Sequence, residues 1–448
     1  MESIATTATR RNVLAGSLAA VGAVALGGRL AAADVSPEDP REQLRRFLGE
    51  YLVPPATLHR FLDPQARTWA RFHPAYGYLL RNSSMRDGVD GASTLARYEL
   101  GGQRKQVNFP GEPCRIHTYG DSFTQGHQVS DGETWQEVLA AHFCEPIRNF
   151  GIGGFGVYQA AMRLLEIEAR DEGAEYLILT VWGDDHFRSI YPWRWLAFPQ
   201  DVLPTLSGEM FHANPWIHAA LDFDTGELID RPNACPDETS LERLSDLDWL
   251  ETTFASDPVV QLLFTRATGV VVDRQPIESL GRLLGQPIDL STEEAARVSA
   301  QRLLHRYGVR VGMRVIDRLH AFARERGKQL MVVLSYPVGS VWHACNRTPD
   351  FNDVDHVDWH PQEFREHLAS LGIPCVDSLP AHVAEFDTFR LSAKDYVDRY
   401  YIGHYNPRGN HFFAYALKDQ VRDWLSPLPP AYRAEAERLI RFEGYLPG

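Results

Sequence analysis

An alternation of short apolar runs with amphipathic helical segments begins near Cys114 and constrains the fold more than any other feature of this chain. The run AEYLILTVWG at residues 174–183 is almost continuously apolar, as expected for a strand that is covered on both faces. Just before it, residues 157–173 carry apolar side chains at helical spacing and end in Gly173. Strands that alternate with helices in this way indicate a parallel sheet joined by crossover helices.

Five segments are predicted to be strands of this sheet. They are residues 115–120, 146–151, 174–183, 329–337 and 373–380. Helices are predicted at residues 134–143, 157–173, 311–327, 361–372 and from 407 towards 424. We therefore expect a three-layer α/β/α fold, with a central parallel sheet of about five strands and right-handed crossovers.

The predicted main domain covers residues 111–425, and a long insertion interrupts it at residues 189–306. The insertion is rich in Trp, Pro and acidic residues and is too long to be a bare loop. We expect it to form a cap over the carboxyl edge of the sheet, where ligands bind in folds of this type. Residues 34–110 are interpreted as an N-terminal extension packed on the main domain, and residues 426–448 as a C-terminal tail.

Residues 1–33 have the pattern of an export signal. Arg10 and Arg11 directly precede a run of apolar and small residues at 13–28, and three alanines follow at 31–33. The run is shorter than the roughly 20 residues that a membrane span needs. The pattern predicts twin-arginine-type export to the periplasm or the exterior without a stable membrane anchor, and an uncleaved anchor is the alternative.

Composition bears on the class of partner. The formal net charge of -14 disfavours nucleic acids and anionic membranes, because their phosphates would be repelled. The five cysteines form no CxxC pair and no spacing typical of a metal site. One or two disulfides could form after export, but the sequence does not pair them.

The segment YGDSFTQG at residues 119–126 follows the first predicted strand directly. Gly120 allows a tight turn, so that Ser122 would stand at the end of the strand and the start of a helix. That position exposes the hydroxyl and brings backbone N–H groups near a developing oxyanion. A serine hydroxyl is a weak nucleophile, so the site also needs a base.

The segment HYNPRGN at residues 404–410 offers that base. His404 stands in a short loop before the last helix, whose first turn suits Pro407. It would reach Ser122 if the first and last strands are arranged as in a flavodoxin-like sheet. Taken alone, a histidine in a loop is more often structural or solvated than catalytic.

Two further loops fall at the same edge of the sheet. RNFGIGGFG at residues 148–156 follows the second strand, and VWGDDHF at 181–187 follows the third. Glycines in such a loop permit the close backbone approach that an oxyanion donor needs, although they also suit a plain strand-to-helix turn.

Together, the blocks resemble those of the SGNH (GDSL-like) hydrolase superfamily over roughly residues 95–190 and 328–425. The block GDSxTxG is matched by Gly120, Asp121, Ser122, Thr124 and Gly126. The block NxGxxG is matched by Asn149, Gly151 and Gly154, and HxNxxG by His404, Asn406 and Gly409. The resemblance implies Ser122 as nucleophile, His404 as general base, and the backbone N–H groups of Ser122 and Gly154 as oxyanion donors, with a third donor from a side chain of the third block.

The third block departs from the family pattern, which has Gly-Asn-Asp where this chain has Gly183, Asp184 and Asp185. An ionised carboxylate cannot donate a hydrogen bond and would repel a developing negative charge. Asp184 and Asp185 remain candidates for the oxyanion or substrate site. Either burial protonates Asp184, or another donor such as His186 substitutes, or the reaction differs.

A second departure precedes His404. The family usually has an aspartate two or three residues upstream to fix the imidazole tautomer, but those positions hold Ile402 and Tyr401. Asp398 is the nearest upstream acid and the first candidate for that role. Weaker candidates are Asp395, Asp377 and a backbone carbonyl.

Two competing interpretations concern other residues of this region. Asp184, Asp185, His186, His404 and His411 could be interpreted as a metal site, but they contain no pair of histidines at i and i+4. We therefore expect no metal and no cofactor. The aromatic run at residues 190–198 fits either the core of the cap or a platform for a sugar ring or an acyl group.

Together with this resemblance, the sequence predicts an exported serine hydrolase of the SGNH type that cleaves a carboxylic ester. The resemblance implies an acetylated carbohydrate or another small ester as the substrate. One alternative is an O-acyltransferase that uses the same acyl-enzyme. The other is a binding protein with a decayed site. The oligomeric state does not follow from the sequence.

Overall fold

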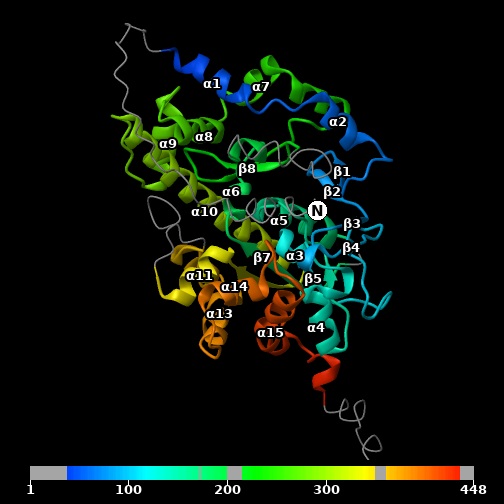
Figure 1. Ribbon diagram of the computed structural model, residues 1–448. Coiled ribbons are helices and arrows are strands. Elements are labelled where there is room, and N and C mark those ends of the chain that lie inside the picture. Colours follow the sequence, from blue (N-terminus) through cyan, green and yellow to red (C-terminus); the bar gives the residue numbers. More distant parts are fainter. Residues whose placement is uncertain (1–37, 171–172, 199–213, 349–359, 434–448) are drawn as a thin grey trace, which may run out of the picture.

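A computed structural model describes residues 38–170, 173–198, 214–348 and 360–433 (Figure 1). The expected export signal and most of the expected C-terminal tail lie outside these ranges. Within them, no helix combines the length and the apolar character that crossing a membrane requires. All five cysteines lie in the described ranges and are free thiols, so none of the disulfides that the sequence left open is formed.

The core of the fold is a five-stranded sheet in which every pair of neighbours is parallel, as predicted. Its strands are β5 (Ile116–Tyr119), β6 (Arg148–Asn149), β7 (Tyr176–Trp182), β10 (Gln329–Ser335) and β11 (Cys375–Asp377). Their spatial order is β11-β10-β7-β5-β6, which is 2-1-3-4-5 when the strands are counted along the chain. The outer strands β6 and β11 are shorter than the sequence predicts, because the glycine loop and a helix cap follow them at once.

Helices cover both faces of this sheet. The larger of these covering helices are α4 (Trp135–Phe143), α5 (Val157–Glu168), α10 (Glu293–Glu325), α12 (Gln362–Ser370) and α15 (Pro407–Trp424). Helix α4 packs against α15, and α5 packs against α10. The central strands β7 and β10 are buried along almost their whole length, which explains their continuous apolar sequences.

Helix α10 differs from the prediction. The sequence separates a helical piece of the insertion from a core helix at residues 311–327, but the structure has one continuous helix from Glu293 to Glu325. Two glycines inside it let the helix approach the segment after β7 closely: a Cβ at Gly312 would stand 2.5 Å from Nδ1 of His186. The end of the insertion expected near residue 306 therefore falls in the middle of a helix.

The described residues of the rest of the insertion lie above the sheet in the view of Figure 1 and include a hairpin and several helices. Its elements are β8 (His218–Leu221), β9 (Leu228–Arg231), α7 (Leu247–Phe254), α8 (Pro258–Thr268) and α9 (Arg274–Leu284). Most side chains of the aromatic run at residues 190–198 are buried, among them Trp193 and Trp195. This burial favours the core interpretation of that run over an exposed platform.

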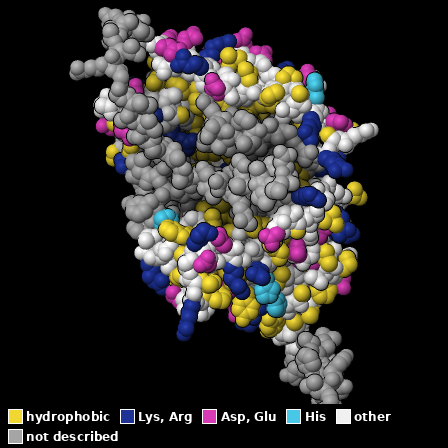
Figure 2. All heavy atoms as spheres, in the orientation of Figure 1, with side chains coloured by type: hydrophobic (Ala, Val, Ile, Leu, Met, Phe, Trp, Pro, Cys, Tyr) yellow, Lys and Arg dark blue, Asp and Glu magenta, His cyan; other side chains and the backbone are white. Residues whose placement is uncertain are grey.

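The described residues of the N-terminal extension contact both the insertion and the glycine loop after β6. The extension contains helices α1 (Pro40–Gly49) and α2 (Pro55–Leu62), the hairpin β1 (Ala70–His73) and β2 (Gly77–Leu80), and the hairpin β3 (Ser83–Met85) and β4 (Thr94–Ala96). Helix α1 packs against α7 of the insertion. Among the described side chains on the face shown in Figure 2, basic and acidic groups are interspersed, without a large field of either sign.

Candidate active site

Ser122 begins the short helix α3 (Ser122–Gln125), directly beyond the end of β5. The turn between them requires Gly120, since a Cβ there would stand 2.3 Å from the hydroxyl of Thr124 and 2.8 Å from the carbonyl of Thr180. Asp121 caps the helix by accepting a hydrogen bond of 2.9 Å from the N–H of Phe123. The hydroxyl of Ser122 is thereby fixed at the carboxyl edge of the sheet and stays partly exposed.

His404 lies in a tight loop between Tyr401 and Tyr405, which pair as an antiparallel bridge. Asn406 caps α15 immediately after the loop, accepting a hydrogen bond of 2.9 Å from the N–H of Gly409. The Nε2 atom of His404 stands 2.7 Å from Oγ of Ser122, although the two residues are 282 positions apart in the sequence. The structure thus joins the two segments that the sequence singles out.

The ring of His404 is oriented by Gln128, a residue that the sequence did not indicate. The side-chain oxygen Oε1 of Gln128 accepts a hydrogen bond of 2.8 Å from the backbone N–H of His404 and lies 3.2 Å from its Nδ1. Gln128 is 8 % exposed and has a left-handed backbone with φ +69°. Its position in GHQV, directly after the serine block, is the only trace of this role in the sequence.

The expectation that Asp398 orients His404 is not met. Asp398 lies on the outer face of α14 (Ala393–Tyr400), where its side chain is 60 % exposed and pairs with Lys394. The weaker candidates are also used elsewhere: Asp395 accepts a hydrogen bond from the hydroxyl of Ser392, and Asp377 accepts one from the N–H of Leu379. The physical reason is helical periodicity, since Tyr396, Val397 and Tyr400 occupy the inner face of α14 and leave Asp398 outside.

The glycine loop after β6 is held by two side chains. Gln125 accepts a hydrogen bond of 2.8 Å from the N–H of Gly153, and the hydroxyl of Tyr78 donates one of 2.5 Å to the carbonyl of Gly153. A Cβ at Gly153 would stand 3.5 Å from Cβ of Ser122, so the loop passes beside Ser122. In a trans peptide the C=O and the N–H point in opposite directions. The N–H of Gly154 therefore points away from Tyr78.

Gly154 itself cannot be replaced without strain. Its φ is +88°, in the left-handed region that favours glycine. A Cβ there would stand 2.5 Å from Nη1 of Arg194 and 2.6 Å from the hydroxyl of Tyr78. The predicted oxyanion donor thus sits in a backbone conformation and a space that only glycine fits.

The third block surrounds a buried arginine on helix α6 (Asp185–Arg188). Arg188 forms an ion pair with Asp184 and donates a hydrogen bond of 2.9 Å to Asp185, and its Nη1 lies 3.9 Å from Oδ2 of Asp121. Asp185 also accepts a hydrogen bond of 2.9 Å from the N–H of Trp182. Burial, together with the neighbouring charge of Asp121, raises the pKa of Asp185 well above its ordinary range. Three carboxyl groups thus surround one guanidinium close to Ser122.

His186 does not serve as the substitute oxyanion donor that the sequence left open. Its ring is buried away from the loop of Gly154, against Gly312 of α10, and its centroid lies 4.6 Å from that of Phe364. Burial lowers the pKa of His186 well below its ordinary value, so the ring is neutral. His411, also considered as a ligand, lies on α15 beside His142. Across the described ranges, no group of three or more acidic, histidine or cysteine side chains could hold a metal ion.

A second imidazole stands next to His404. The rings of His127 and His404 are 4.8 Å apart in an edge-to-face arrangement, and Nε2 of His127 lies 3.7 Å from a carboxylate oxygen of Asp87. On the other side, Phe123 packs against His404 and stacks on Trp182 at 5.1 Å. These neighbours come from three separate segments, around Asp87, residues 123–127 and Trp182, which is why spacing in the sequence did not bring them together.

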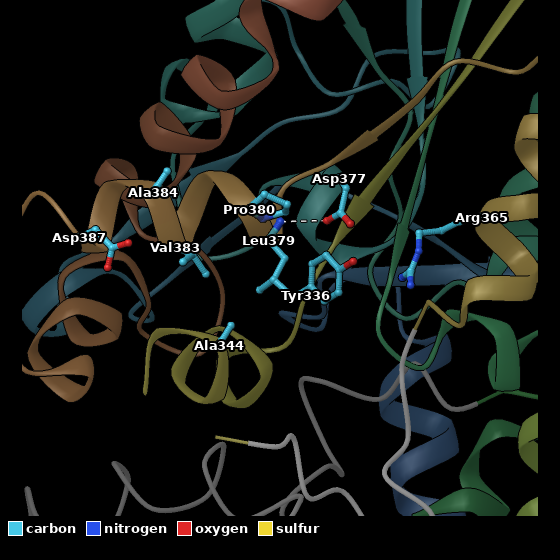
Figure 3. Close-up of a pocket in the computed structure, with 9 residues that line it drawn as sticks. All are labelled: Tyr336, Ala344, Arg365, Asp377, Leu379, Pro380, Val383, Ala384 and Asp387. Carbon is cyan, nitrogen blue, oxygen red and sulfur yellow. Dashed lines mark hydrogen bonds between the residues drawn. The ribbon is translucent and has the colours of Figure 1, made fainter. Parts of the chain in front are cut away.

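One hollow among the described residues lies apart from Ser122 and His404. This hollow of about 750 Å³ lies beyond the ends of β10 and β11 (Figure 3). Its polar groups come from Tyr336, Arg365, Asp377 and Asp387, and α13 (Leu379–Phe386) closes one side. Neither Ser122 nor His404 lines it, so its shape gives no measure of the substrate.

The arrangement around Ser122 can activate a hydroxyl, hold a neutral imidazole in one orientation and present backbone N–H groups to an anion. Burial, with smaller contributions from His127 and Arg188, lowers the pKa of His404 well below its ordinary value, so the ring is a free base at neutral pH.

In comparisons with known proteins, no family model matches this sequence and no curated protein matches it significantly.

Proposed function

We propose that this protein is a serine hydrolase that cleaves a carboxylic ester through an acyl-enzyme on Ser122. The observation that carries the proposal is the contact of 2.7 Å between Oγ of Ser122 and Nε2 of His404. A hydroxyl that shares its proton with a neutral imidazole is the arrangement that makes serine a nucleophile.

In the proposed reaction, His404 takes the proton of Ser122 while Oγ attacks the ester carbonyl carbon. The carbonyl electrons move to the oxygen, and the N–H groups of Ser122 and Gly154 stabilise the resulting oxyanion. The bond from carbon to the alcohol oxygen then breaks, and His404 returns the proton to the departing alcohol. Water repeats the sequence with His404 as base and releases the acid, so no cofactor takes part.

The resemblance to SGNH hydrolases supports this proposal independently of the single contact. The strand order 2-1-3-4-5 is that of flavodoxin-like sheets. The first three blocks directly follow strands β5, β6 and β7, and the fourth block, which follows α14, meets them through the contact of His404 with Ser122. The altered third block does not leave a bare negative charge, because Arg188 pairs with Asp184. We further propose that the enzyme acts outside the cytoplasm on an acetylated carbohydrate or another small ester, on the strength of Arg10 and Arg11 and of that family resemblance.

The test is a panel of p-nitrophenyl esters and acetylated sugars, assayed with wild type, Ser122→Ala and His404→Ala. The proposal expects release of acid from at least one ester and a loss of roughly 10³-fold or more in either variant. Ser340→Ala is the control, since this buried serine lies on α11 (Val338–Asn346), away from Ser122. Full activity in Ser122→Ala would reject the proposal.

Two other outcomes have specific meanings. If an added polysaccharide acquires the acyl group in place of water, the enzyme is an O-acyltransferase on the same acyl-enzyme, and hydrolysis as the function is rejected. If no ester is cleaved and Ser122 fails to react with a serine-directed probe, the protein is a binding protein with a decayed site.

A further inference from the structure

The amide of Gln128 is held in one orientation by two backbone groups. Its Nε2 donates a hydrogen bond of 3.0 Å to the carbonyl of Asp87, which can only accept. Its Oε1 faces the backbone N–H of His404 at 2.8 Å, and that group can only donate. Exchanging the nitrogen and oxygen atoms would place donor against donor and acceptor against acceptor. An oxygen therefore faces His404.

This oxygen dictates the tautomer of the imidazole. It lies 3.2 Å from Nδ1 of His404 and can only accept, so the ring hydrogen sits on Nδ1. The lone pair of Nε2 is then directed at the hydroxyl of Ser122, 2.7 Å away. Asp398, the nearest upstream acid, is at the surface and cannot perform this task.

We propose that Gln128 is the positioning residue of the catalytic histidine, and that an uncharged amide performs the task that a carboxylate performs in Ser-His-Asp enzymes. The inference rests on the proposed function, because it concerns the base of that reaction. It also has a chemical consequence. A neutral amide stabilises the imidazolium formed during acylation less than a carboxylate would, so His404 is a weaker base than in an enzyme with an aspartate.

The other charged and titratable groups around His404 do little to stabilise a positive charge on its ring. His127 stands beside it and is itself near Asp87, and Arg188 of α6 opposes a positive charge on the ring. Asp121 is the nearest carboxylate on the serine side, with Oδ2 at 3.4 Å from Oγ of Ser122 and 3.9 Å from Arg188. The same groups remain in every Gln128 variant, so differences between variants report on position 128 alone.

Gln128→Met and Gln128→Glu form a matched pair. Both variants keep the length of the side chain, and neither can donate the hydrogen bond to the carbonyl of Asp87. They therefore differ only in whether a strong acceptor, the carboxylate of Gln128→Glu, faces His404. For Gln128→Met we expect kcat to fall about 100-fold with KM nearly unchanged, since an imidazole in the wrong tautomer costs a serine protease up to roughly 10⁴-fold. For Gln128→Glu we expect kcat within about 10-fold of wild type, and the acidic limb of the pH profile of kcat/KM displaced upward by about 1 pH unit or more. Gln362→Met, on the exposed end of α12, is the control and leaves both unchanged.

A direct measurement does not depend on turnover. In protein labelled with ¹⁵N-histidine, the NMR signal of His404 is the one that disappears in His404→Gln. The chemical shifts of its two ring nitrogens are measured at a pH above the pKa of His404, where the ring is neutral. We expect a protonated Nδ1 and an unprotonated Nε2 in wild type and in Gln128→Glu, and a mixture of tautomers in Gln128→Met. A protonated Nε2 in wild type, or a methionine variant with unchanged tautomer and unchanged kcat, would overturn the inference.

The two proposals fail separately. If wild type cleaves no ester while His404 shows the expected tautomer, the proposed function is wrong and the positioning by Gln128 stands. If Ser122→Ala abolishes activity while both Gln128 variants match wild type in kcat and pH profile, the function stands and the role of Gln128 is rejected.

Discussion

The hydroxyl of Tyr78, in the hairpin β1–β2 of the N-terminal extension, donates a hydrogen bond of 2.5 Å to the carbonyl of Gly153 beside Ser122. This bond fixes the peptide whose N–H belongs to Gly154, the predicted oxyanion donor. The extension also supplies the carbonyl of Asp87 that anchors Gln128. Residues 38–110 thus complete the site as well as packing on the domain.

The first prediction concerns that hydroxyl. Tyr78→Phe keeps the buried ring and removes the bond that orients the peptide, so kcat should fall about 10- to 100-fold, less than the 10²- to 10³-fold loss of a whole oxyanion donor. KM should change little. Tyr76→Phe is the matched control, because it removes a hydroxyl from the same hairpin, one that bonds Glu166 and not the loop. Steady-state kinetics at constant pH check both variants, and equal losses in the two would contradict the assigned role.

The second prediction concerns Gly154. Gly154→Ala must place a Cβ against Arg194 and Tyr78 at a φ of +88°. We expect activity to be lost and the free energy of unfolding to fall by about 1–3 kcal/mol. Chemical denaturation and ester assays measure the two effects. Gly339→Ala, on α11 where a Cβ meets no atom within 4 Å, should leave both activity and stability close to those of wild type.

The third prediction concerns Asp184. Replacing it with asparagine restores a side chain that can donate to an oxyanion, while Asp185 and Asp121 still face Arg188. We expect kcat to rise, by about 10-fold, which is below the full value of one oxyanion donor. Ester kinetics on Asp184→Asn and Asp184→Ala separate gain of a donor from loss of a charge. A large fall in kcat for the asparagine variant would show that the Asp184–Arg188 pair itself is required.

The sequence predicts those parts of the fold and of the site that continuous segments form. It does not predict contacts between residues that are far apart along the chain. The parallel sheet, Ser122 and His404 follow from local patterns, since each strand and block is a continuous segment. Gln128 does not, because only the loop geometry at φ +69° and a contact across 276 positions bring its amide to His404. Asp398 was expected from its distance along the chain alone, and the periodicity of α14 turns it outward. The contribution of Tyr78 depends on long-range packing, which residue spacing does not encode.

The fourth prediction concerns acid stability. Burial lowers the pKa of His218 and His360 to about 4 and that of His382 to about 3, from an ordinary value of 6.5. Below pH 6.5 the unfolded chain therefore binds protons that the folded protein does not, so stability falls as the pH falls towards 4. Each group contributes up to about 1.4 kcal/mol per pH unit in this window. Denaturation curves between pH 7 and 4.5 should show this slope, and His218→Gln should reduce it. An unchanged slope in the variant would contradict the buried, neutral state of that ring.

Covalent labelling with a fluorophosphonate, followed by peptide mass analysis, shows directly whether the hydroxyl of Ser122 is a nucleophile. We predict one modified residue, Ser122, in wild type, much slower labelling in His404→Ala, and no labelling in Ser122→Ala. A wild-type protein that stays unlabelled, or labelling that persists when Ser122 is replaced, would contradict this prediction.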